Sequence, residues 1–155
     1  MMLRRHVLAA LAAAPLAFAV AAPAHAQKAI YQNKDGAIRG YDAVAYFTEN
    51  KPVKGKAEFA HQWMGANWLF VTAENRDAFK ADPEKYAPQY GGYCAYAMAE
   101  YANTVEIDPN AWTVEGGKLY LNYSKGVQTT WEKDKVKFIA KADKNWPPIK
   151  GTLKP

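Results

Sequence analysis

One sequence pattern occurs twice in this chain, 52 residues apart, and it constrains the fold more than any other feature. Each copy contains an apolar run, a glycine turn, a second apolar run, and a Ser or Thr that precedes a helical pattern. The matching residues are Gly65 and Gly117, Trp68 and Tyr120, Leu69 and Leu121, Thr72 and Ser124, and Phe79 and Trp131. We therefore predict an α+β fold, with a small antiparallel sheet built from two strand–turn–strand–helix units. Unrelated units with the same order of elements would give a similar pattern, so the repeat itself is a hypothesis.

The predicted elements follow from this pattern. Residues 58–63 and 68–71 form the first pair of strands, and Thr72 caps the helix that follows. Residues 111–114 and 119–123 form the second pair. Ser124 then caps one long C-terminal helix that runs to about residue 144 and is stopped by Pro147 and Pro148. Its predicted core stripe comprises Val127, Trp131, Phe138 and Ala142.

The N-terminus has the signature of a secretory signal peptide. Arg4 and Arg5 precede an uncharged apolar run at residues 7–20, and a small-x-small cleavage site ends at Ala26. A membrane anchor is the alternative, but the run is shorter than the roughly 20 residues that span a bilayer. We predict that residues 1–26 are removed. Residues 27–155 then form a single periplasmic or secreted domain without stable membrane insertion, and the paired arginines leave twin-arginine export open.

The mature chain has few residues that bind metals or act as nucleophiles. Cys94 is the only cysteine, which excludes an intramolecular disulfide, and His61 is the only histidine after residue 26. A His₃ or His₂Glu zinc site and a His₂Cys blue-copper site are therefore excluded within one chain. The modest charge of an exported protein also argues against a nucleic-acid partner. The lysine-rich segment 118–155 is either a solvated helix face or a surface for an acidic protein or membrane partner.

Residues 42–86 resemble a YHS domain, a small metal-associated module. Its usual pattern is Asp-Pro-Val-Cys-Gly-Met, then Gly-x-x-Tyr-x-Phe-Cys-Ser-x-x-Cys, then Phe-x-x-x-Pro-x-x-Tyr. This chain matches the framework with DAVAYF at 42–47, GANWLFVTAEN at 65–75 and FKADPEKY at 79–86. Ala45, Val71 and Asn75 stand where the pattern has metal-ligating cysteines. The whole mature chain resembles exported bacterial YHS-domain proteins, and the YHS-like core covers about residues 40–98.

A different metal site is therefore predicted. Cys94 and Met98 are one helical turn apart, and His61 lies on the first hairpin. Thiolate, thioether and imidazole together suit a soft ion such as Cu(I). The alternative is structural, with Cys94 and Met98 as core residues and His61 as a hydrogen-bonded core histidine. Gly91 and Gly92 are predicted to present Cys94 at a helix N-terminus, which would lower its pKa and increase its reactivity.

Tyr90, Tyr93 and Tyr96 surround Cys94 in the sequence. They are interpreted either as the lining of an aromatic ligand cleft or as residues at the edge of the core whose hydroxyls find backbone partners.

Three functions are consistent with these residues. The first is an exported, non-enzymatic protein that binds or handles a soft metal ion such as copper. The second is a scaffold that binds a partner or small ligand in an aromatic cleft without a metal. The third is an enzyme with Cys94 as nucleophile and His61 as base, which requires the sulfur and imidazole to lie within about 4 Å. No catalytic residue is assigned from the sequence.

Overall fold

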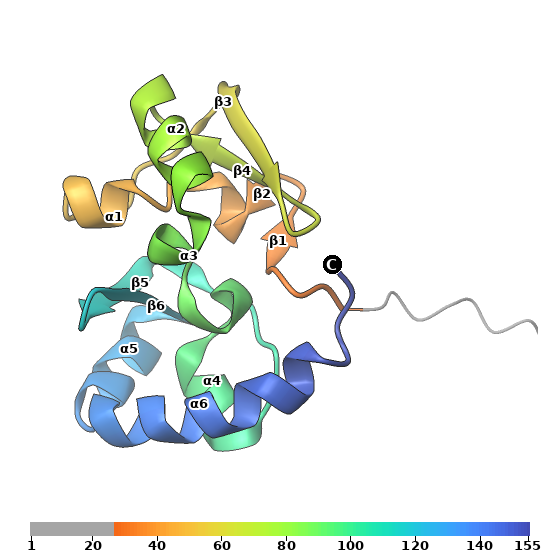
Figure 1. Ribbon diagram of the computed structural model, residues 1–155. Helices are drawn as coiled ribbons and strands as arrows, with labels where there is room; N and C mark the ends of the chain where they lie inside the picture. The colour runs from red at the N-terminus through yellow and green to blue at the C-terminus, as the bar shows by residue number, and fades with distance from the viewer. Residues whose placement is uncertain (1–26) are drawn as a thin grey trace, which may run out of the picture.

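The computed structural model describes residues 27–155 and confirms the α+β fold (Figure 1). The predicted signal peptide, residues 1–26, lies outside the described residues. The strands are β1 (Gln32–Asn33), β2 (Gly36–Ala37), β3 (Lys56–Trp63), β4 (Ala66–Phe70), β5 (Asp108–Glu115) and β6 (Lys118–Asn122). The helices are α1 (Ala45–Thr48), α2 (Ala73–Ala81), α3 (Pro83–Tyr86), α4 (Ala95–Tyr101), α5 (Lys125–Glu132) and α6 (Lys135–Lys150), with 3₁₀ turns η1 (Ile38–Gly40) and η2 (Gln89–Gly92). Within residues 27–155, no helix has the length and apolar character needed to cross a membrane.

The first predicted unit is a hairpin followed by a helix. Strands β3 and β4 pair antiparallel through a two-residue turn at Met64 and Gly65, both of which have positive φ angles of 48° and 71°. Such turns match the twist of the strands that they join. Thr72 caps α2, because its side chain accepts a hydrogen bond from the Asn75 amide at 3.1 Å. These local interactions explain why the sequence pattern predicts this unit well.

The second unit repeats the residue pairing of the first hairpin. In β3–β4 the pairing shifts between Lys56 and Ala60, and in β5–β6 it shifts between Asp108 and Trp112. Every paired position of the first hairpin has its counterpart 52 residues later. Ser124 caps α5 as Thr72 caps α2, and the turn at Gly116 and Gly117 again has positive φ angles. The two hairpins form separate two-stranded sheets.

The repeat also extends upstream of the hairpins, which the sequence analysis did not recognise. Ile38, Arg39 and Gly40 have positive φ angles, and so do the residues 52 positions later, Tyr90, Gly91 and Gly92. The segments that follow read GYDAVAY at 40–46 and GYCAYAM at 92–98.

One backbone hydrogen bond supports this equivalence. The Asp42 amide donates to the Val53 carbonyl at 2.8 Å, and the Cys94 amide donates to the Val105 carbonyl at 2.9 Å. We refer to residues 38–81 as the first unit and residues 90–132 as the second unit. Asp42 and Cys94 are therefore equivalent positions in two copies of one structural unit.

The two units share one hydrophobic core. Trp68, Phe79, Leu119 and Leu121 belong to a cluster that also contains Cys94. A second cluster lies between α4, α5 and α6, and it comprises Tyr90, Ala95, Met98, Ala99, Tyr120, Trp131 and Ala142. In Figure 1, α3 runs between an upper half with β3, β4 and α2 and a lower half with β5, β6 and α4–α6.

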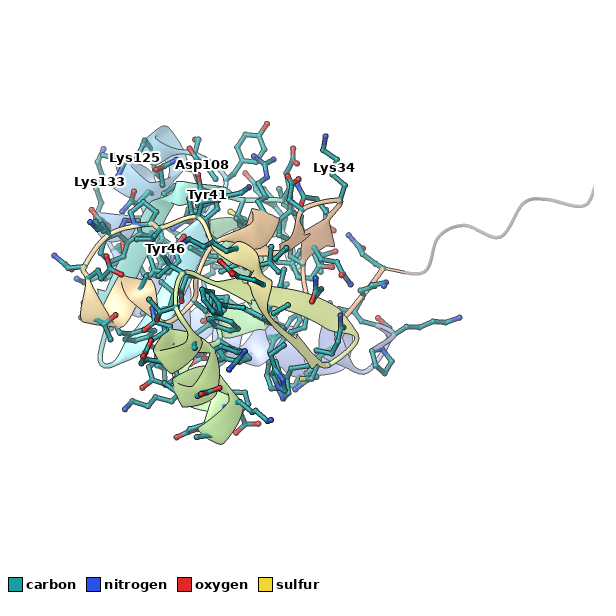
Figure 2. All side chains as sticks on the ribbon, turned by 90° about the horizontal axis from the view of Figure 1, so that it is seen from above. Lys34, Tyr41, Tyr46, Asp108, Lys125 and Lys133 are labelled. Atoms are coloured by element: carbon teal, nitrogen blue, oxygen red, sulfur yellow. The ribbon has the colours of Figure 1, made fainter. Side chains whose placement is uncertain are left out.

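Tyr46 joins the two halves through both its ring and its hydroxyl. The ring lies 5.3 Å from that of Trp112, and the hydroxyl donates to the Pro109 carbonyl at 2.8 Å. Figure 2 shows Tyr46 near Tyr41 and Asp108, whereas Lys34 projects from the edge of the molecule. Burial is the main cause of the raised pKa of Tyr46, and the nearby carboxylates of Asp108 and Asp42 add to it.

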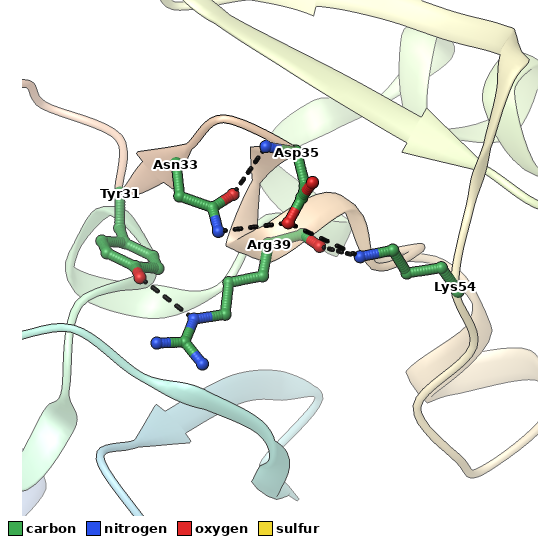
Figure 3. A network of polar contacts seen from close by, with 5 residues as sticks. All are labelled: Tyr31, Asn33, Asp35, Arg39 and Lys54. Carbon is green, nitrogen blue, oxygen red and sulfur yellow. Dashed lines mark hydrogen bonds and ion pairs between the residues drawn. The ribbon is translucent and has the colours of Figure 1, made fainter.

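A small polar network fixes the segment before the first unit (Figure 3). Arg39 Nε donates to the Tyr31 hydroxyl at 3.2 Å, and Lys54 Nζ donates to the Arg39 carbonyl at 2.8 Å. Asn33 contacts Asp35 through its side chain, and Asp35 lies 4.0 Å from Lys54. These bonds hold the backbone at Arg39, where the left-handed conformation is unusual for a residue with a side chain.

The C-terminal helix differs from its prediction in two respects. Two helices replace the single predicted one, because Asp134 leaves the helical conformation between α5 and α6. The second, α6, continues past Pro147 and Pro148 to Lys150. The prolines lie in its last turns, where the Gly151 amide still donates to the Pro147 carbonyl at 3.1 Å. The loss of a helical hydrogen bond at each proline therefore occurs close to the natural end of the helix.

Replacing Tyr46 with Phe tests the hydrogen bond from the Tyr46 hydroxyl to the Pro109 carbonyl, which joins the two units. The phenol stays protonated in the folded state because its pKa is raised, so its stabilising effect is complete below pH 10 and decreases as the pH rises above this value. We expect Tyr46→Phe to lower the free energy of unfolding at neutral pH by about 1 kcal/mol, through the lost hydrogen bond. The variant should also lose less stability between pH 9 and pH 11 than the parent protein.

Urea unfolding at a series of pH values measures both effects. Tyr101→Phe is the control, because Tyr101 is 69% exposed and its hydroxyl does not join the two units. An unchanged pH dependence in Tyr46→Phe would contradict this account.

Candidate functional site

The buried polar centre of the first unit is the Asp42 carboxylate. Its side chain is 0% exposed. One oxygen accepts hydrogen bonds from the amides of Val44 and Ala45 at 2.8 and 3.1 Å. The other accepts from the Val71 amide at 2.9 Å and from Asn75 Nδ2 at 2.8 Å. Ala45, Val71 and Asn75, which the resemblance places at the cysteine positions of the YHS pattern, converge on this carboxylate.

Cys94 occupies the equivalent place in the second unit. Its sulfur accepts a hydrogen bond from the Tyr123 amide at 3.3 Å, and the amides of Tyr96 and Ala97 are also directed toward it. These three amides lie 52 residues after those of Val71, Val44 and Ala45. The polar cradle that surrounds the Asp42 carboxylate is thus repeated around a thiol. Asn75 has no polar counterpart, because Val127 stands at that position.

Burial determines the acidity of Cys94. The side chain is 1% exposed at the N-cap of α4, and burial raises the pKa of the thiol. The amides of Ala97, Tyr123 and Tyr96 lower this pKa but do not outweigh the loss of solvation. The predicted position at the start of a helix is therefore correct, but the predicted net lowering of the pKa is wrong, because burial outweighs the amides.

Asn122 is the polar side chain next to Cys94, and the sequence analysis missed it. The Cys94 thiol donates to Asn122 Oδ1 at 3.7 Å, and the same oxygen accepts from the Tyr96 amide at 3.1 Å. Asn122 is fully buried, and its Nδ2 has no hydrogen-bond partner among the described residues. The sequence could have indicated Asn122, because it is a polar residue that follows the apolar run of β6.

His61 and Met98, the other predicted metal ligands, lie in different surroundings. His61 is half-buried on β3, and its ring packs 6.3 Å from that of Phe79. Met98 is fully buried in the second hydrophobic cluster, whereas Cys94 belongs to the first. Met98 is also the counterpart of Tyr46, a core position of the first unit. Within residues 27–155, no three His, Cys, Asp or Glu side chains are grouped as a metal site.

The predicted aromatic residues point to separate places. The Tyr90 hydroxyl donates to Asp143 at 2.9 Å, and the Tyr93 hydroxyl donates to the Lys28 carbonyl at 2.6 Å. Tyr96 packs against Phe138, with 5.2 Å between the ring centres. Tyr90 lines a cavity of about 320 Å³, and Tyr93 lines a second cavity of about 430 Å³ near the N-terminal segment.

Substitution of Asp42 tests the polar centre of the first unit. Asp42→Ala leaves buried amides without acceptors, so we expect the free energy of unfolding to fall by about 2–4 kcal/mol. Urea denaturation measures this change. Asp77→Ala is the control, because Asp77 is exposed and pairs only with the adjacent Arg76. A loss no larger than that of the control would refute the role assigned to Asp42.

The reactivity of the Cys94 thiol gives a second test. Since its pKa is raised, the thiolate fraction at pH 7 is smaller than that of a free cysteine, and the sulfur is also shielded from solvent. We expect the folded protein to react with a disulfide reagent at least about 100-fold more slowly than the urea-unfolded chain, and faster as the pH rises. Absorbance of the released thiol measures the rate. Equal rates for folded and unfolded protein would contradict the buried state.

Comparison with known proteins finds one domain model that matches part of the chain. The model of the YHS domain matches residues 44–90, which include β3, β4, α2 and α3. No significant match was found among curated proteins or solved structures. The matched segment ends before Cys94, so the second unit is recognised from the repeated backbone geometry. Residues 44–90 therefore match the YHS domain, and the hairpin and helix of this segment have a second copy later in the chain.

Proposed function

We propose that this protein is an exported, non-enzymatic metal-handling protein that binds a soft ion such as Cu(I) through Cys94. YHS domains are generally associated with metal handling, and this chain contains one. The observation that carries the proposal is the equivalence of Cys94 and Asp42. The cysteine positions of the YHS pattern surround Asp42 in the first unit, so the only sulfur nucleophile of the chain lies at the corresponding centre of the second unit.

The chemistry of Cys94 favours a soft ion over a hard one. A thiolate is a ligand for Cu(I) and similar soft ions. The backbone amides around Cys94 stabilise the negative charge of this thiolate. Binding replaces the thiol proton, so the apparent affinity falls as the pH decreases. Because the sulfur is 1% exposed, the ion needs a local opening of α4 or β6 to reach it.

His61 and Met98 are proposed as additional ligands. Imidazole and thioether have the right softness, but their contacts with Phe79 and with the second cluster have to rearrange for either to join Cys94. Their substitution should therefore have smaller effects than substitution of Cys94. The alternative of a Cys94 nucleophile activated by His61 has less support, because the thiol is buried, has a raised pKa and donates to Asn122.

Export is part of the proposal and rests on the signal-peptide signature. Removal of residues 1–26 leaves the described domain in an oxidising compartment, where a buried thiol is protected from disulfide exchange by its low exposure.

Competition titration with Cu(I) tests the metal site. The parent protein should bind one Cu(I) per chain under anaerobic conditions, and Cys94→Ser should reduce the affinity by at least about 100-fold, since no other thiolate is present. His61→Ala and Met98→Leu are expected to reduce it by about 10-fold or less. A chromophoric Cu(I) chelator measures the competition, and circular dichroism verifies that each variant folds.

Tyr101→Phe serves as a control that leaves every proposed ligand in place. Unchanged Cu(I) affinity in folded Cys94→Ser would exclude Cys94 as the ligand. Absence of stoichiometric binding to the parent protein would exclude Cu(I) handling by this chain alone.

A further inference from the structure

A cavity of about 320 Å³ lined by Tyr90 lies outside the Cys94 region. Its walls come from the N-terminal segment, the β3–β4 turn, α3, η2, the start of β6 and the end of α6. Figure 1 shows the β3–β4 turn and the end of α6 on the same side of the molecule, near the C-terminus. The lining residues therefore come from both units, and neither unit would form the cavity alone.

Three aromatic side chains supply flat apolar surface to a cavity whose lining is otherwise largely polar. Trp63 lies on the first hairpin, Tyr90 in η2 and Trp146 on α6. The ring of Trp146 lies 6.4 Å from that of Tyr90, whose hydroxyl is fixed by Asp143. Trp63 is held by an edge-on contact with Phe79 at 5.7 Å. These contacts orient the rings before any ligand arrives, which lowers the entropic cost of binding.

The backbone of the cavity wall is also tightly constrained. Met64 and Tyr90 both have positive φ angles, of 48° and 58°. Gly91 has no room for a side chain, because an added Cβ would lie 2.0 Å from the Ala29 carbonyl oxygen. Residues in such conformations persist only where the surrounding structure fixes them. The wall is therefore preformed.

Charged groups at the cavity give it a positive excess. Lys118 and Lys150 line it, and Glu84 is the one acidic residue that does so. None of the three is part of an ion pair found among residues 27–155. Both lysines are exposed, and their long side chains can place an ammonium group over the opening while their methylenes cover apolar surface.

We propose that this cavity binds a small planar aromatic molecule that carries one carboxylate or similar acidic group. The ring packs against Trp63, Tyr90 and Trp146, and the acidic group pairs with Lys118 and Lys150. Aromatic surfaces beside convergent polar groups occur in small-molecule sites, and the volume of about 320 Å³ lies at the lower end of their usual range. This binding is independent of the Cys94 metal site.

Binding of 2-naphthoate to the full mature chain tests the proposal. Tryptophan fluorescence and amide chemical shifts measure the affinity, with the neutral 2-naphthamide and the cationic 2-naphthylmethylammonium ion as matched probes. A ligand of this size is expected to bind with a dissociation constant of about 1 mM or lower. The neutral probe should bind about fivefold more weakly, and the cation more weakly still.

Variants then locate the site. Lys118→Gln and Lys150→Gln should each weaken 2-naphthoate about 2- to 5-fold without changing the affinity for 2-naphthamide. Trp146→Leu should weaken both probes by about 10-fold through the lost aromatic contact. Lys137→Gln is the control, because Lys137 is exposed on α6 and does not line the cavity. Cys94→Ser should bind 2-naphthoate normally, which separates this result from the metal titration.

Three results would overturn the proposal. The first is no chemical-shift change of the Trp146 indole or its neighbours at millimolar 2-naphthoate. The second is equal affinity for the anionic and neutral probes, and the third is parent-like affinity for 2-naphthoate in Trp146→Leu and in both lysine variants. The lysine variants lie at exposed positions, so they decide the question even if Trp146→Leu does not fold.

Discussion

The structure depends on a buried polar group that organises the backbone around it. In the first unit, the Asp42 carboxylate accepts four hydrogen bonds from residues of α1, the end of β4 and α2. These bonds fix the distance between the hairpin and the helices while the carboxylate is shielded from water. A buried charge is tolerated only when its hydrogen bonds are satisfied, and this requirement defines one arrangement of the three elements. The apolar contacts of Trp68 and Phe79 then fill the space beside it.

The second unit keeps this arrangement and changes its chemistry. Cys94 replaces the carboxylate, Val127 replaces Asn75, and the amide of Tyr123 still faces the central atom. A thiol needs less hydrogen bonding than a carboxylate, so the centre of the second unit can be less polar while it stays equally buried. The consequence is a sulfur that is buried and shielded from reagents. For the proposed binding of a soft ion at Cys94, access would require a local opening of the structure.

The junction of the two units creates a feature that neither unit has. Trp63 belongs to the first hairpin and Trp146 to the helix that follows the second unit, yet both line one cavity. The residues that line the cavity are not repeated in the second unit, since the position equivalent to Trp63 is Glu115. The two similar units form the scaffold, and the cavity arises where their unlike surfaces pack together. The contact of Tyr46 with Trp112 and Pro109 holds the halves together on a different part of their interface.

Local chemistry in the sequence determined both hairpins, their turns and their helix caps. Gly65 and Gly117 fit turns with positive φ angles, and Thr72 and Ser124 cap the helices through their own side chains. The 52-residue repeat was therefore visible in part from single residues. The tertiary structure alone decided that Asp42 and Cys94 are equivalent, because this depends on amides brought together from distant segments. It also decided that burial outweighs the helix terminus in setting the pKa of Cys94, and that Met98 faces a different cluster. Desolvation and side-chain direction arise from the whole packed chain, so no local pattern could reveal them.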